Sequence, residues 1–331
     1  MKKIISFFLA AILLIVILSA CSSAENEQKK TEEKKKIQIV TTIFPEYDWV
    51  KNILGENPAD AEVTLLLDNG VDLHSYQPTA DDILKISDCD MFIYVGGESD
   101  EWVEDALSEA TNKDMKAVNL LEALGENVKE EEIVEGMESE EEEESNEEHE
   151  HEHEYDEHVW LSLKNTTLLV DKIESELASI DSQNADIYKK NADTYKEKLN
   201  KIDDEYKSAA DKANVKTLLF GDRFPFRYLT DDYGLGYYAA FAGCSAETEA
   251  DFETVVFLAN KVDELSVDTI LTIDGSDRKI AETIKDNTKT KDQKIMTMDS
   301  MQSTTMNDIN NGTTYLSVME NNLEVFKEAL K

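Results

Sequence analysis

The stretch YKKNADTYKEKLNKIDDEYKSA, residues 188–209, decides how the rest of the chain is organised. Its apolar residues recur at alternating intervals of four and three, the spacing of one face of a helix. They are Tyr188, Ala192, Tyr195, Leu199, Ile202, Tyr206 and Ala209. From Leu163 to Phe220 there is neither glycine nor proline to force a break. Because tyrosines and alanines make a poor coiled-coil zipper, we predict a rigid helix over 181–214 that joins two flanking halves.

Each half alternates short, β-branched apolar runs with helical patterns. The runs are Ile37–Ile43, Val63–Leu67, Met91–Val95 and Ala117–Leu120 in the first half, and Thr217–Phe220, Tyr237–Phe241, Thr269–Ile273 and Ile295–Met298 in the second. Strands that alternate with helices are typical of parallel sheets built from βαβ units. We therefore predict an α/β protein of two lobes, residues 37–180 and 215–331, each a parallel sheet with flanking helices.

The N-terminus has the pattern of an export signal. Lys2 and Lys3 precede an apolar run that ends at Leu18 and is short for a membrane span. The run continues into Leu-Ser-Ala-Cys, which resembles the lipobox of bacterial lipoproteins and puts Cys21 in the lipidated place. Residues 22–36 are polar and without apolar periodicity, as in a tether. We predict a signal peptide over 1–21 and a mature protein outside the cytoplasmic membrane, anchored by lipid on Cys21.

The chain is strongly acidic, with 72 Asp and Glu against 33 Lys and Arg and a net charge of −39. A polyanion repels phosphate backbones, which argues against nucleic acid as a partner and favours cations. Seventeen of the acids lie in residues 130–157, which contain no Lys or Arg. Because this segment has few apolar residues, we predict a disordered loop over 129–157. Cys89 and Cys244 are too few for a disulfide framework, and we expect unpaired structural thiols.

Four of the five histidines lie in EEHEHEHEYDEHVW, residues 147–160. His149, Glu150 and His153 match the zinc-protease pattern H-E-x-x-H, but that motif needs a rigid helix, and the flanking glutamates offer no apolar face to hold one. No nucleophile–base pair stands out either, so we predict a protein that is not an enzyme. His149, His151 and His153 instead favour loose collection of divalent metal, since imidazole suits Zn, Cu and Ni.

The two remaining histidines are expected to be held by the fold. His158 stands where the acidic segment rejoins an apolar run, shortly before a helical pattern over Thr166–Ile180. His74 lies in the loop after the predicted strand Val63–Leu67. Parallel sheets bind ligands at the carboxyl ends of their strands. We expect both histidines to leave strand ends and to converge in one site.

Around these two histidines the chain resembles a known family. GVDLHSYQPTADDILKISDCDMFIYVGGESDEW, which contains His74, resembles the first-ligand motif of the metal-specific solute-binding lipoproteins of bacterial ABC importers. DEHVWLS, which contains His158, resembles their second-ligand motif, although Leu73 and Glu157 replace the usual prolines. An acidic, His-rich loop is a trait of the zinc-specific members. The resemblance implies a monomer that holds a metal between its lobes through His74 and His158.

The partners implied by the resemblance are an ABC permease and its ATPase. This chain has no G-x-x-x-x-G-K-[ST] phosphate-binding motif, so the ATPase must be a separate chain. The membrane is a further partner through the lipid anchor.

The third ligand of the family, a histidine in zinc members and a glutamate in manganese members, is missing here. The region reads LLFGDRFPFRYLTDDYGL, and Arg223, which cannot bind a cation, falls at the ligand position. We predict that Asp222 substitutes, with a helix cap or an ion pair to Arg223 as the alternative role. The fourth position, an acid after a later strand, falls on Asp274, with Asp277 in reserve.

Two imidazoles and two carboxylates suit zinc, but they resemble the ligand set of the manganese members equally well. The His-rich loop favours zinc. We therefore predict extracytoplasmic capture of Zn²⁺, with Mn²⁺ as the alternative. Two other functions stay open: a surface adhesin with a structural metal, and a cleft that takes a chelated metal or acts as a sensor.

Overall fold

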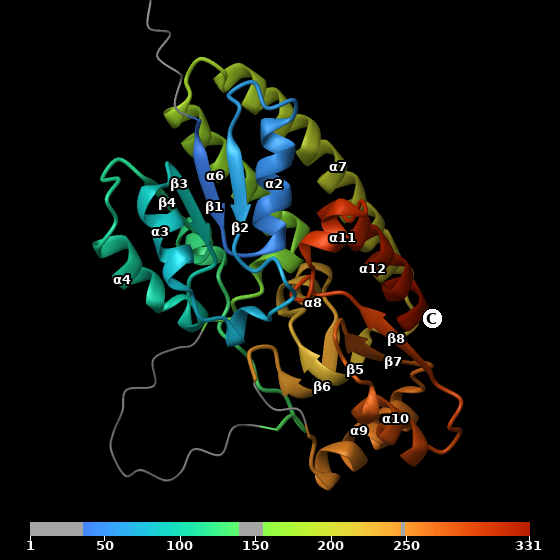
Figure 1. Ribbon diagram of the computed structural model, residues 1–331. Coiled ribbons are helices and arrows are strands. Elements are labelled where there is room, and N and C mark those ends of the chain that lie inside the picture. The colour runs from blue at the N-terminus through green and yellow to red at the C-terminus, as the bar shows by residue number, and fades with distance from the viewer. Residues whose placement is uncertain (1–35, 139–154, 246–248) are drawn as a thin grey trace, which may run out of the picture. The chain divides into compact units, whose positions relative to one another are not determined.

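A computed structural model of the chain describes residues 36–138, 155–245 and 249–331 (Figure 1). Two sheets with parallel strand pairs form its framework, in the orders β2-β1-β3-β4 and β6-β5-β7-β8. The first contains β1 (Gln38–Thr41), β2 (Glu62–Leu65), β3 (Met91–Tyr94) and β4 (Lys116–Asn119). The second contains β5 (Thr217–Phe224), β6 (Gly236–Ala242), β7 (Thr269–Ile273) and β8 (Lys294–Met298). Every predicted strand is present, which confirms the α/β fold with two sheets.

Helices flank both sheets. They are α2 (Phe44–Leu54), α3 (Ala80–Asp88), α4 (Trp102–Ser108), α5 (Leu120–Leu124), α6 (Leu163–Ile180), α7 (Ala185–Lys212), α8 (Arg227–Tyr233), α9 (Phe252–Leu265), α10 (Lys279–Asn287), α11 (Met306–Asn310) and α12 (Tyr315–Ala329). The interior of β3 shows why the helices are needed: Met91, Phe92 and Ile93 are all fully buried, so both faces of the strand are covered.

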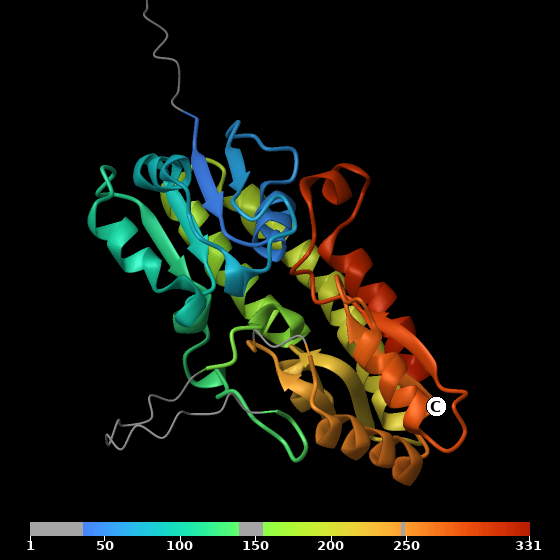
Figure 2. The same cartoon turned by 60° about the horizontal axis from the view of Figure 1, so that its bottom comes forward.

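The long helix is α7, which has 28 residues and is therefore about 42 Å long. Its predicted stripe is buried, except that Ala210 takes the last place instead of Ala209. One end of α7 packs on α2 and α6, and the other end packs on α8 and α12. Helix α12 lies beside α7 in both views (Figures 1 and 2). Tyr195 donates its hydroxyl to Asp48 in the first lobe (3.2 Å), and Tyr206 to the Met319 carbonyl in the second (2.9 Å). The prediction of one helix joining two lobes is confirmed.

Strand β5 is longer than predicted. It continues past Phe220 to Phe224, with a shift in its pairing to β6 between Phe220 and Arg223. Such an irregularity turns side chains away from the regular alternation of a strand. As a consequence, Asp222 and Arg223 are fixed on the sheet and do not lie in a loop.

The prediction of a disordered loop over 129–157 is wrong at both ends of that segment. Glu132 accepts a hydrogen bond from the Tyr237 hydroxyl at 3.1 Å. The backbone N–H of Glu138 donates to the Ala240 carbonyl at 3.0 Å and so adds to the edge of β6. The prediction was based on the number of acidic residues, which does not reveal that Glu132 and Glu138 have fixed partners on β6.

Several predicted features lie outside the described residues. They are the signal peptide (1–21) with Cys21, the tether (22–36) apart from Lys36, and His149, His151 and His153. In the part of the chain that the structure describes, no helix combines the length and the apolar character needed to cross a membrane.

Because α7 packs on both lobes, we expect Leu199→Ala to weaken the whole folded unit and not one lobe alone. Leu199 is fully buried, and truncation of such a side chain costs about 2–5 kcal/mol of stability. Denaturant unfolding should show one transition at lower denaturant, whereas Lys198→Ala, at an exposed position of the same helix, should leave the midpoint nearly unchanged. Two separated transitions in Leu199→Ala would contradict the joint role of α7.

Candidate metal centre

A cavity of about 550 Å³ lies at the carboxyl ends of strands from both sheets. It is lined by the loop after β2, which carries His74, by the loop after β6, which carries Cys244, and by the loop after β7, which carries Asp274. Asp222 and Arg223 of β5 also line it. The carboxyl ends of parallel strands are the usual ligand-binding edge of such sheets.

His74 is held through its backbone and through one nitrogen of its ring. It lies in a short 3-10 turn, Leu73–Ser75, where the Asp72 carboxylate accepts its backbone N–H at 3.0 Å. Its ring Nδ1 lies 2.8 Å from the Ser99 hydroxyl and 3.4 Å from the Glu157 carboxylate. The carboxylate assigns the ring proton to Nδ1, which leaves the Nε2 lone pair free.

His158 is fully buried and is held by Asp156. One Asp156 oxygen accepts both the His158 backbone N–H (2.8 Å) and the ring Nδ1–H (3.0 Å). This contact again leaves Nε2 as the free ring nitrogen. The expectation that His158 leaves a strand end is wrong. It precedes the 3-10 turn Val159–Leu161, whose Trp160 donates a 2.9 Å hydrogen bond to the Ser300 carbonyl.

The two free Nε2 atoms face each other at 3.2 Å. In a tetrahedral zinc site with Zn–N bonds of 2.0–2.1 Å, two ligand nitrogens lie about 3.3 Å apart. The histidines thus already stand at the separation that zinc requires. Without a cation between them, two lone pairs at this distance repel, so the arrangement favours a proton or a metal ion in that place.

The electrostatics of the pair are asymmetric. Burial and the charge of His158 lower the pKa of His74 to about 3, so its imidazole stays neutral. Burial acts in the same direction on His158, but the carboxylates of Asp156, Glu157 and Glu131 outweigh it and raise its pKa above the ordinary value. In the metal-free site the proton therefore belongs to His158, whose Nε2 donates it to Nε2 of His74.

Cys244 is a third potential ligand that the sequence analysis missed. One ligand atom from each of His74, His158 and Cys244 lies within 4.8 Å of the other two. Burial and the neighbouring carboxylates, Asp156 first, raise the pKa of the Cys244 thiol, so it is protonated while no metal is bound. The sequence signal that could have found it is its position directly after β6, the same criterion that selected His74.

Arg223, which the family resemblance puts at the third-ligand position, makes an ion pair that crosses between the lobes. Its Nη2 donates to Asp72 at 2.7 Å, and the other oxygen of Asp72 holds the backbone of His74. The alternative that Arg223 pairs with Asp222 is therefore wrong. Asp222 accepts the backbone N–H groups of Arg223 (2.9 Å) and Ile273 (3.4 Å).

Asp274 and Asp277 line the same cavity but differ in their contacts. Both oxygens of Asp274 accept backbone and hydroxyl hydrogen bonds, one from Ser300 and the other from Ser303. Asp277 pairs with Lys279. Neither carboxylate, nor that of Asp222, belongs to the cluster of His74, His158 and Cys244.

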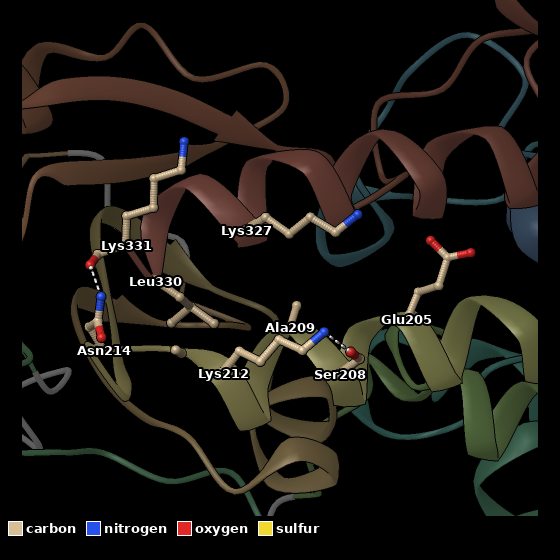
Figure 3. A pocket seen from close by; sticks show the side chains of 9 residues that line it. Glu205, Ser208, Ala209, Lys212, Asn214, Lys327, Leu330 and Lys331 are labelled. Atoms are coloured by element: carbon tan, nitrogen blue, oxygen red, sulfur yellow. Dashed lines mark hydrogen bonds between the residues drawn. The ribbon is translucent and has the colours of Figure 1, made fainter.

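A second cavity, of about 460 Å³, lies at the C-terminal ends of α7 and α12. Figure 3 shows Lys212, Lys327 and Lys331 around it, with Lys212 hydrogen-bonded to Ser208. Three ammonium groups against the single carboxylate of Glu205 make this place unsuitable for a metal cation. The cavity at the carboxyl ends of the strands is therefore the candidate metal centre.

Comparison with known proteins identifies the family of the chain. The model of the family described as zinc-uptake complex component A, periplasmic (ZnuA), matches residues 39–329. The chain belongs to this family. The resemblance inferred from the motifs around His74 and His158 is confirmed at the level of the family.

Two curated relatives and one solved structure illustrate the similarity. The zinc-binding lipoprotein AdcA of Streptococcus pneumoniae is 32% identical over 292 residues, 88% of this chain and 55% of that protein. The high-affinity zinc uptake system protein ZnuA of Bacillus subtilis is 29% identical, over 89% of this chain and 88% of that protein. The crystal structure of the Zn(II)-bound ZnuA-like domain of S. pneumoniae AdcA has a TM-score of 0.69 at 28% identity, and covers 89% and 99% of the two chains. The chain thus spans about half the length of the first curated relatives that it matches.

For this ZnuA-family chain we expect Gly243→Ala to weaken zinc binding by roughly tenfold or more, the scale of changes that misorient a ligand histidine. A Cβ at Gly243 would lie 2.9 Å from Cε1 of His158 and 2.9 Å from the Phe224 carbonyl, so the ring must move. Gly236→Ala is the matched control, because its Cβ would meet nothing closer than 3.5 Å. Equal zinc affinity of the two variants in calorimetric titration would contradict the placement of His158.

Zinc binding should weaken as the pH falls through the raised pKa of His158, because zinc and a proton compete for the same nitrogen. The loss should begin at a higher pH than for a free imidazole, whose pKa is about 6.5. Titrations between about pH 6 and 8, in buffers of different ionisation enthalpy, measure both the affinity and the protons released. An affinity that stays flat across this window would show that His158 is not protonated before zinc binds.

Proposed function

We propose that the protein captures Zn²⁺ outside the cytoplasmic membrane, in the cavity at the carboxyl ends of its two sheets, and delivers it to the permease of an ABC importer. The observation that carries this proposal is the 3.2 Å approach of Nε2 of His74 and Nε2 of His158, each with its Nδ1 held by a neighbour. Membership of the ZnuA family supports zinc as the ion.

In this proposal His74 and His158 each donate one nitrogen to the metal. Asp156 and Glu157 keep their rings oriented and place negative charge behind them, which strengthens the metal bonds. Asp274 is proposed as an oxygen donor, for which one of its oxygens must exchange a serine hydrogen bond for the metal.

Asp222 is also proposed as an oxygen donor to the metal, because it lines the same cavity beside Arg223. It would have to release the backbone N–H groups that it now accepts. Asp277 is the reserve, and it would have to leave Lys279.

The remaining parts of the proposal concern the surroundings of the site. Lipid on Cys21 would anchor the protein to the membrane, with residues 22–36 as a tether. His149, His151 and His153 would collect metal near the cavity without forming the principal site. The permease and its ATPase are separate chains, and the protein acts as a monomer.

The direct test is calorimetric titration of zinc and manganese into the full chain and three variants. His74→Ala and His158→Ala should each weaken zinc binding by roughly 100-fold or more, since a change outside the ligand shell already costs typically about 10–100-fold. His151→Ala should have little effect, because His149 and His153 offer equivalent donors.

The control for the histidine-rich segment replaces residues 139–154 by a Gly-Ser linker of equal length. This change keeps the packed ends of the acidic segment, and we expect one high-affinity zinc site with lower total stoichiometry. If the linker variant lost its high-affinity site, the histidine-rich segment would itself be the site. If manganese bound more tightly than zinc, the manganese alternative would replace the proposal.

A further inference from the structure

We propose that the thiolate of Cys244 is the third protein ligand of the zinc bound by His74 and His158. This inference rests on the proposed function and refines its ligand set: Cys244 takes the place proposed for Asp222, and Asp274 remains the proposed oxygen donor. It is motivated by the donor set, because two imidazoles leave a four-coordinate zinc short of ligands, and Arg223, which lines the same cavity, pairs with Asp72. Among the described residues, Cys244 alone joins the two histidines in a cluster able to hold a metal.

The distances fit a site that closes slightly around the ion. The three ligand atoms lie within 4.8 Å of one another. With Zn–S of 2.3 Å and Zn–N of 2.0–2.1 Å, a tetrahedral site needs sulfur and nitrogen about 3.6 Å apart. A movement of at most about 1.2 Å, the difference between 4.8 Å and 3.6 Å, therefore brings the sulfur within bonding distance.

The surroundings hold Cys244 close to the histidines. The Glu131 carboxylate accepts the backbone N–H of Cys244 at 3.0 Å and also acts on His158, so it fixes this loop beside the site. Gly243 lets this loop lie against the His158 ring, since any Cβ there would collide with it. The thiol itself lines the cavity and is not in a disulfide.

The bond formation is balanced without a redox change. Zn²⁺ takes one lone pair from each histidine Nε2 and bonds to the sulfur of Cys244. The Nε2–H bond of His158 and the S–H bond of Cys244 break, and both protons leave to solvent. The zinc–thiolate unit keeps a net positive charge, which the carboxylates of Asp156 and Glu157 behind the histidines stabilise. Because thiolate ligands favour zinc while carboxylates suit manganese, Cys244 would also select between the two ions.

The experiment uses Co²⁺ as a spectroscopic substitute for zinc in the full chain carrying Cys21→Ser, which leaves Cys89 and Cys244 as the thiols. We expect visible bands of four-coordinate cobalt together with a near-ultraviolet thiolate-to-cobalt charge-transfer band. Cys244→Ser should abolish the charge-transfer band and weaken zinc binding by roughly tenfold or more. Cys89→Ala is the matched control and should retain the band, because Cys89 is fully buried beside Met115, outside the cluster.

A second measurement does not depend on the folding of Cys244→Ser. In the Cys21→Ser, Cys89→Ala chain Cys244 is the remaining thiol, and stoichiometric zinc should slow its alkylation by iodoacetamide by roughly tenfold or more. Cobalt or zinc binding at one site without the charge-transfer band and without protection would overturn the role of Cys244 and leave the proposed function standing. Absence of any high-affinity binding would overturn both.

Discussion

Two imidazole nitrogens, Nε2 of His74 and Nε2 of His158, stand 3.2 Å apart, and the rest of the site depends on this approach. Two lone pairs at such a distance repel unless a cation lies between them. The protein maintains the approach by binding the other nitrogen of each ring, to Asp156 on one side and to Ser99 and Glu157 on the other. The buried carboxylates favour a positive charge between the rings, which the proton of His158 supplies in the metal-free site and a metal ion would supply in its place.

The fold explains how such distant residues meet. His74 lies in the loop after β2 of the first sheet, and Cys244 lies in the loop after β6 of the second sheet. Both loops are at the carboxyl ends of parallel strands. Helix α7 packs on both lobes and holds these edges in a fixed relation. The ion pair between Arg223 and Asp72 adds a direct connection across the cavity, on the residue that also holds the backbone of His74. Mechanical and electrostatic support for His74 therefore come from both lobes.

Periodicity was sufficient to predict the strands and α7, because burial of one face or both faces leaves a repeating apolar pattern. Periodicity did not predict that Asp222 lies on a strand. Strand β5 extends past the apolar run from which it was predicted, and its pairing with β6 shifts between Phe220 and Arg223. The acidic segment was mispredicted at its ends for a similar reason: Glu132 and Glu138 have specific partners on β6 that no compositional measure reveals.

The site was predictable only in part. The motifs around His74 and His158 indicated two residues that the fold does bring together. Cys244 was taken as a structural thiol because a single cysteine has no spacing pattern. Its proximity to the histidines arises only in the folded chain, where the loop after β6 brings it within 4.8 Å of both rings' ligand atoms. Asp274 was a reasonable ligand by position, but its four hydrogen bonds to Ser300 and Ser303 could not be anticipated from sequence.

The measurement that tests the central claim most directly is a crystal structure of the zinc-loaded protein, with anomalous diffraction recorded on both sides of the zinc absorption edge. The account predicts one dominant zinc peak about 2.0–2.1 Å from Nε2 of both His74 and His158. A zinc peak elsewhere, with these two nitrogens still in direct contact with each other, would contradict it.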